Sequence, residues 1–208
     1  IIHSQFNAHL VKQGIKVDRL EGHMKWWLFD VLRKRLPKKQ TLAITAAAEH
    51  LTAIMAEALF QRKEVMGEAD PRMFAMYAWH AMEEMEHKAV AFDVMQKVAK
   101  VWYPRRVMAL LQTTLSFNIN VLAFANAMLR QDGFTRWQRV KLFAKGLAWV
   151  YGPGGMFMGT WRSYVRYFKP GFHPWQEPPT PVYALWLDTF NRTGDPVEAG
   201  RVVYAAAT

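Results

Sequence analysis

A run of 23 residues, from Val107 to Leu129, contains no charged side chain and is long enough to cross a bilayer as a helix. The run nevertheless carries polar residues, and at 100° per residue four of them fall within one arc of about 100°: Gln112, Thr113, Ser116 and Asn120. This polar stripe favours a helix that is buried in a bundle, or that lies at an interface, over a transmembrane helix. No stretch of the chain alternates convincingly with a period of two, so the sequence predicts an all-α fold.

Helix-breaking residues divide the 208-residue chain into helical segments of what we expect to be a single domain. We expect helices up to about residue 13, at 18–36, 41–65, 71–100, 107–129, 133–150 and 156–168, and then a last one at 182–194 after a Pro-rich extended segment. Residues 1–100 are predicted to hold the metal-binding helices, and residues 101–208 form a basic, aromatic-rich helical extension. Because the sequence begins inside a helical pattern without a cap, we expect further residues to precede Ile1.

The formal charge of +10 is concentrated in residues 101–170, which hold ten Lys or Arg, one acid and 14 of the 29 aromatic residues. Such a segment suits an anionic membrane surface or an acidic substrate, and equally a solvated surface over an aromatic core. No helix-turn-helix, RNA-binding or zinc-finger pattern accompanies the charge, so we expect no nucleic-acid partner.

Because the chain contains no cysteine, disulfides and thiol catalysis are excluded. With no visible secretory signal, we expect a cytoplasmic protein, with the inner face of the membrane as a candidate location.

Four ionisable side chains form a narrow row on the helix expected at 71–100. With His80 placed at 0°, Glu83 lies at about 300°, Glu84 at about 40° and His87 at about 340°. Apolar residues flank the row, so we expect it to face the core, where unpaired charge needs a compensating cation. The Glu84-x-x-His87 unit is the recurring ligand pair of di-iron and di-manganese carboxylate bundles.

Two further ligands are expected on other helices. Glu49 lies in "AAAEHLTA", where small neighbours let another helix approach and where a Glu is rarely buried unpaired. His3 would form a second Glu-x-x-His unit if a Glu directly preceded Ile1. The predicted metal ligands are therefore His3, Glu49, His80, Glu84 and His87.

Glu83 is the predicted catalytic residue, a general base beside the metal. Carboxylate and imidazole ligands without sulfur suit iron or manganese, and zinc less exclusively, and five ligands indicate two metal ions. A structural polar network without metal is the alternative interpretation of the row. We interpret His50 as a packing residue or a neighbour of the ligands, and His173 as part of a structural loop.

Three segments, "QTLAITAAAEHLTAIMAE", "WHAMEEMEHKAVAFDV" and "KPGFHPW", resemble a bacterial family described as predicted metal-dependent hydrolases, and the similarity extends over nearly the whole chain. The ligand pattern separately resembles the ferritin-like di-iron oxygenases that oxidise aryl amines. That second resemblance implies a ferritin-like helical bundle with additional C-terminal helices. It places His3 on the second helix of the bundle, Glu49 on the third, and the row on the fourth.

These observations leave three functions open. The ligand types favour an O₂-activating di-iron oxygenase or oxidase, with two iron ions, an apolar or aromatic small-molecule substrate and an electron donor. The alternative is a metal-dependent hydrolase with a two-metal-activated water. The second alternative is a non-catalytic module that binds an anionic membrane surface and holds a structural metal. A second copy of the chain, forming a homodimer, is a further candidate partner.

Overall fold

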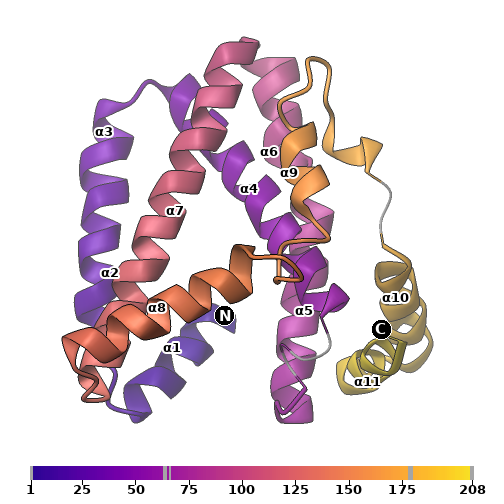
Figure 1. Ribbon diagram of the computed structural model, residues 1–208. Coiled ribbons are helices and arrows are strands. Elements are labelled where there is room, and N and C mark those ends of the chain that lie inside the picture. The colour runs from indigo at the N-terminus through magenta and orange to yellow at the C-terminus, as the bar shows by residue number, and fades with distance from the viewer. Residues whose placement is uncertain (1, 63–64, 66, 178–179, 207–208) are drawn as a thin grey trace.

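A computed structural model describes residues 2–62, 65, 67–177 and 180–206 of the chain (Figure 1). These residues contain helices and no strand, which confirms the predicted all-α class. The elements in chain order are α1 (Ile2–Lys12), α2 (Val17–Lys25), the π-helical η1 (Trp26–Leu32), α3 (Arg33–Arg35), α4 (Lys38–Gln61), α5 (Pro71–His87), α6 (Val90–Asp93), the π-helical η3 (Val94–Val98), α7 (Tyr103–Gln131), α8 (Arg136–Tyr151), α9 (Trp161–Arg166), the 3₁₀ turn η4 (Pro174–Gln176), α10 (Pro181–Thr193) and α11 (Pro196–Ala206).

Helix α4 is the central element of the fold. It packs against α5, α6, α7 and α9, and Figure 1 shows it running diagonally across the molecule from the end of α3. Its packing side is built from small residues, and Ala43, Ala46 and Ala47 are all fully buried. Because the distance between packed helices depends on the side chains at their contact, alanines allow several helices to approach α4 closely.

Two clusters of buried side chains lie along α4. The first joins α4 to α6, η3, α7 and the segment after α9, and its largest members are Phe92, Met95, Leu110, Tyr167 and Phe172. The second joins the C-terminal half of α4 to α5, α10 and α11, and it includes Phe60, Met82, Met85, Trp186 and Val203. The C-terminal helix pair therefore shares a core with the helix that carries the ionisable row.

Local helix signals account for most of the helices but not for all of their ends. Asp70 caps α5 as predicted, accepting a hydrogen bond of 2.9 Å from the backbone N–H of Arg72. The helix predicted to run to residue 100 instead ends at His87 and continues, after a turn, as α6 and η3. Helix α11 was not predicted from the sequence, although Asp195 precedes it and accepts a 2.8 Å hydrogen bond from the backbone N–H of Val197.

Helix α7 contains the uncharged run and is less covered than a bundle helix would be. By length and composition alone, α4 and α7 could each cross a membrane, but 44% of the most apolar window of α4 is buried inside the fold and only 17% of that of α7. On α7 the buried side chains are Arg106, Ala109, Leu110 and Thr113. The expectation of a buried bundle helix is therefore wrong for most of α7, and the interface-lying alternative remains. The ferritin-like arrangement of the bundle stays a prediction.

Candidate functional site

The predicted row of ionisable side chains lies on one side of α5. His80 Nδ1 is 3.8 Å from Glu83 Oε2, and His80 Nε2 is 3.6 Å from Glu84 Oε1. These separations place three of the four side chains together, as the helical wheel predicts. The His80 and Glu84 side chains are 27% and 22% exposed.

The row does not face the core, and that part of the sequence prediction is wrong. The buried residues of α5 are Ala75, Ala78, Ala81, Met82 and Met85, which centre about half a turn away from the row. Helix α5 contacts α4 and α11 through this side, because its small residues let both helices approach. The row is left on the more open side, where Glu83 is 46% exposed and His87 is exposed.

Glu49 brings a second carboxylate to the row from α4. Burial raises the pKa of Glu49, the negative charge of Glu84 raises it further, and His87 opposes that rise. Glu49, Glu84 and His87 therefore lie close enough across the α4–α5 contact to interact electrostatically. Two half-buried carboxylates that repel each other beside an imidazole are a donor set whose chemistry suits a divalent cation.

The same residues are not arranged as a finished coordination shell. In the part of the chain that the structure describes, no group of three or more His, Cys, Asp or Glu side chains could hold a metal ion as it stands. His3 belongs to α1, but its side chain lies outside the described residues. Metal ligation by His3, Glu49, His80, Glu84 and His87, and the catalytic role of Glu83, therefore stay predictions.

A pocket of about 220 Å³ lies nearby on α4 and α5, and neither Glu49 nor any residue of the row is part of its lining. Three of its residues, His50, Met85 and Lys88, directly follow Glu49, Glu84 and His87 in the chain. Its lining comes from α4, α5, α9 and the segment 174–183, and consists of His50, Ala53, Ile54, Glu57, Met85, Lys88, Ser163, Arg166, Pro174, Trp175, Glu177, Thr180 and Tyr183. We call this cavity the polar pocket.

Two acids and two bases share the polar pocket. Lys88 Nζ donates a 3.0 Å hydrogen bond to the Glu177 carbonyl oxygen, and Arg166 Nη1 lies 3.6 Å from Glu177 Oε1. Burial raises the pKa of Glu57, and the charge of Glu177 adds to the rise, while Lys88 and a hydrogen bond with Ser163 oppose it. Glu177 Oε1 is buried and has no hydrogen-bond partner among the described residues. Within the pocket, Arg166 is therefore the charged partner of Glu177 Oε1, at a separation longer than a hydrogen bond.

His50 forms the inner wall of the polar pocket. Its ring is 3% exposed and packs 4.7 Å from the ring of Tyr167 and 5.4 Å from that of Phe172. Its Nε2 lies 3.2 Å from the Ser163 carbonyl oxygen, so Nε2 carries the proton and donates. Burial lowers the pKa of His50 to about 4, and the ring is neutral near neutral pH.

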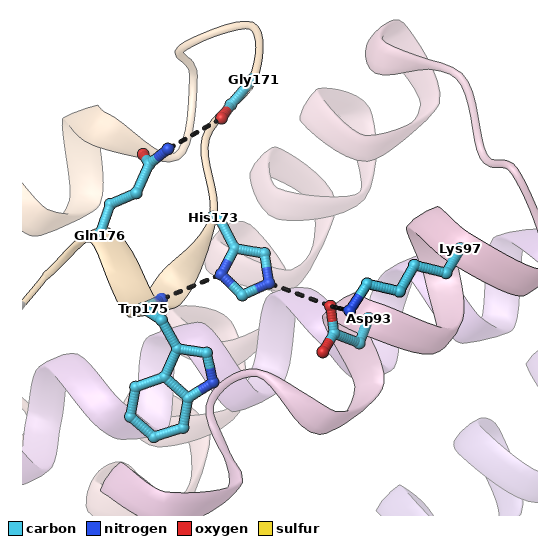
Figure 2. A network of polar contacts seen from close by, with 6 residues as sticks. All are labelled: Asp93, Lys97, Gly171, His173, Trp175 and Gln176. Carbon is cyan, nitrogen blue, oxygen red and sulfur yellow. Dashed lines mark hydrogen bonds and ion pairs between the residues drawn. The ribbon is translucent and has the colours of Figure 1, made fainter.

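His173 lies in the loop at residues 171–177, part of which lines the polar pocket, and its ring is hydrogen-bonded on both sides (Figure 2). His173 Nδ1 accepts a 3.2 Å hydrogen bond from the backbone N–H of Trp175, so its Nε2 carries the proton and donates to Asp93 Oδ1 at 3.0 Å. Asp93 also pairs with Lys97 at 2.9 Å, and both bonds lower its pKa. The interpretation of His173 as part of a structural loop agrees with these contacts.

Sequence reasoning missed the polar pocket, because its residues come from four separate parts of the chain. One signal was present: Glu57 follows His50 by seven residues, which places both on the same side of α4. The partners that enclose them, Lys88, Arg166 and Glu177, carry no local pattern that indicates a shared site.

No curated protein and no solved structure matches the chain. The model of one family, described as predicted metal-dependent hydrolase, matches residues 2–178, which include the row, Glu49 and most of the polar pocket. Because this match covers far more than half of the sequence, the chain belongs to the family of predicted metal-dependent hydrolases.

Proposed function

We propose that the protein is a metal-dependent hydrolase whose metal is held between α4 and α5 by Glu49, Glu84 and His87, with His80 beside them. The observation that carries this proposal is the electrostatic interaction of Glu49 on α4 with Glu84 and His87 on α5. A cation at that point would relieve the repulsion between two half-buried carboxylates. The polar pocket is lined by the residues that directly follow Glu49, Glu84 and His87 in the chain, and we propose it as the place for the substrate.

Each side chain around such a site is proposed to have its own role in hydrolysis. A bound divalent metal supplies a Lewis acid and a water of lowered pKa. Glu83 lies 3.8 Å from His80 and is 46% exposed, which supports a role as the base that takes a proton from the attacking water. Lys88 and Arg166 line the polar pocket, where their positive charge would stabilise negative charge on a bound substrate.

Membership of the hydrolase family supports this reaction class over the oxygenase or oxidase that the ligand types first suggested. The identity and number of the metal ions belong to the proposal as well. We propose two ions, with iron, manganese and zinc as the metals to compare.

The charged lining of the polar pocket also changes the expected substrate. A cavity of about 220 Å³ that contains two acids and two bases suits a small molecule with polar groups. We therefore propose a polar reacting end for the substrate, in place of a wholly apolar or aromatic one.

Metal content of matched variants tests the site. We expect Glu84→Gln and His87→Ala to lower metal affinity at least tenfold, since each removes a donor that the remaining shell cannot replace. Glu86→Gln is the control, because Glu86 lies on the same helix outside the row and its amide can still accept from Tyr183. Wild-type metal content in both variants would overturn the site.

Measurements of turnover distinguish a general base at Glu83 from a metal ligand at that position. With zinc or manganese restored, Glu83→Gln should retain its metal and lose most hydrolysis of small ester, amide and phosphoester test substrates. Loss of metal in this variant would instead make Glu83 a ligand. Equal hydrolysis by the variant and the wild type would remove the general-base assignment.

A further inference from the structure

Helix α7 presents an exposed apolar stripe. Met108, Leu111, Leu115, Ile119 and Leu122 are between 37% and 64% exposed. At 100° per residue they fall within an arc of about 80°, and the stripe is roughly 20 Å long. The other side of α7 is held against α4. The stripe is therefore a fixed part of the surface, because α7 cannot rotate to bury it without leaving the core.

Helix α8 carries a similar stripe with basic flanks. Trp137, Val140, Leu147 and Tyr151 are 43–76% exposed and lie within an arc of about 80°. The helix contains no acid, and four basic residues accompany the stripe: Arg136, Arg139, Lys141 and Lys145. An apolar stripe between basic side chains is the pattern of a helix that lies in the plane of a membrane surface.

The two stripes converge on one apolar cavity of about 680 Å³, which we call the apolar cavity. Leu111 and Leu115 of the α7 stripe and Tyr151 of the α8 stripe all line it. Tyr151 also donates a hydrogen bond to Asn118 Oδ1, which ties the end of α8 to α7. Most of the lining is apolar, so the cavity opens on the exposed stripes and offers little to a polar ligand.

We propose that the stripes of α7 and α8 dock on an anionic lipid bilayer and that the apolar cavity receives one acyl chain from it. Charge complementarity favours this occupant, because Arg136, Lys141 and Lys145 accompany the exposed apolar side chains of α8, and that helix contains no acid. The anionic inner face of a membrane attracts such a surface, while its chains accept the stripes. This docking is independent of the proposed hydrolase chemistry.

Environment-sensitive labelling tests the docking on the whole protein. The chain contains no cysteine, so Trp137→Cys and Leu115→Cys each give one attachment point for an NBD fluorophore. With phosphatidylglycerol vesicles we expect a blue shift and a several-fold gain in emission at both positions. Arg192→Cys, on the exposed end of α10, is the control and should not change.

The charge dependence of vesicle binding is a second test. Binding should be at least tenfold weaker to neutral phosphatidylcholine vesicles, and equally in a variant with Gln in place of Arg136, Lys141 and Lys145. High salt should weaken binding by the same amount, because it screens these charges. Equal binding to neutral and anionic vesicles, or none to either, overturns the proposal. So does a label shift that appears without lipid and grows with protein concentration, which would identify a second copy as the occupant.

A cavity-filling variant tests the acyl chain separately. Leu115→Trp should weaken binding of a fluorescent fatty acid severalfold while phosphatidylglycerol vesicles are still bound. Unchanged fatty-acid binding in this variant would remove the cavity from the proposal.

Discussion

Arg106 is a buried cation whose partners are backbone carbonyls. The residue is 3% exposed, and its Nη2 donates to the carbonyl oxygens of Tyr167 at 2.9 Å and of Lys169 at 2.6 Å. Its guanidinium also lies 5.1 Å from the ring centroid of Tyr103 and 5.3 Å from that of Tyr167. Burial lowers the pKa of Arg106, although the two tyrosines oppose the change. Arg106 thus fastens the end of α9 to α7 beside the first core cluster.

Replacement of this cation should destabilise the fold. Arg106→Met keeps much of the volume but leaves two carbonyl oxygens without their charged donor. We expect the free energy of unfolding in urea to fall by about 2–4 kcal/mol. Arg105→Met, on the neighbouring and half-buried residue, is the control and should change it by less than about 1 kcal/mol. Equal losses in the two variants would contradict the structural role of Arg106.

His50 should make stability depend on pH. Its pKa is lowered from 6.5 to about 4 by burial, so below pH 6.5 the unfolded chain binds a proton that the folded chain does not. The free energy of unfolding therefore falls as the pH drops from 6.5 to 4, by about 3 kcal/mol at most from this residue. His50→Gln, whose amide can still donate to Ser163, should remove that part of the pH dependence. His23→Gln, at an exposed histidine, should leave it unchanged.

Among the elements, the existence of helices was more predictable than their boundaries. Repeated apolar spacing and local breakers are enough to indicate a helix, and the N-cap of α5 and the end of α10 at Gly194, with φ of 67°, followed from single residues. The break after His87 was not predictable in this way. Lys88 bonds to Glu177, which is 89 residues away in the chain, so the end of α5 depends on tertiary contacts.

The ionisable row shows the same division between local and tertiary information. Helical spacing placed His80, Glu83 and Glu84 together, because that geometry depends on one helix alone. Spacing could not say which side of α5 would be covered. The side with Ala75, Ala78 and Ala81 is the one that is buried, because small residues permit closer packing of the neighbouring helices.

Removal of the His173 ring should loosen the loop at residues 171–177. His173→Ala abolishes the acceptor for the Trp175 amide and the hydrogen bond to Asp93, so hydrogen exchange at residues 171–177 should become at least tenfold faster. The contact with Asp93 also predicts that acidification loosens this loop. Because the pKa of Asp93 is lowered, the stabilisation is lost as the pH falls through the range in which that carboxylate is protonated.

Gln176→Ala is the matched control for this loop. Gln176 bonds to the carbonyl oxygen of Gly171 from an exposed position in the same loop. Exchange as slow in the His173 variant as in this control would show that other contacts hold the loop.

At the scale of the whole molecule, the α10–α11 pair completes both the core and the polar pocket. Trp186 packs edge-to-face on Trp79 at 5.5 Å and is 4% exposed, which joins α10 to α5. Tyr183 lines the pocket and donates a 2.8 Å hydrogen bond to Glu86. This pair lies beyond residues 2–178, where the family match ends.

A substitution at Gly200 should separate this helix pair from the rest of the molecule. A Cβ atom at Gly200 would lie 3.4 Å from the Cα atom of Ala75 and from Cδ1 of Phe74, so the larger side chain of Gly200→Leu has no room between α11 and α5. We expect the free energy of unfolding to fall by about 1–3 kcal/mol. Gly22→Leu is the control, because nothing lies within 4 Å of a Cβ there, and it should be neutral or gain up to about 1 kcal/mol from helix propensity. Exchange at residues 196–206 should accelerate in the Gly200 variant before the remaining helices open, since α11 loses its contact with α5 first. If these amides stay as protected as in the wild type while stability falls, the pair is not a separable unit and the molecule opens as one.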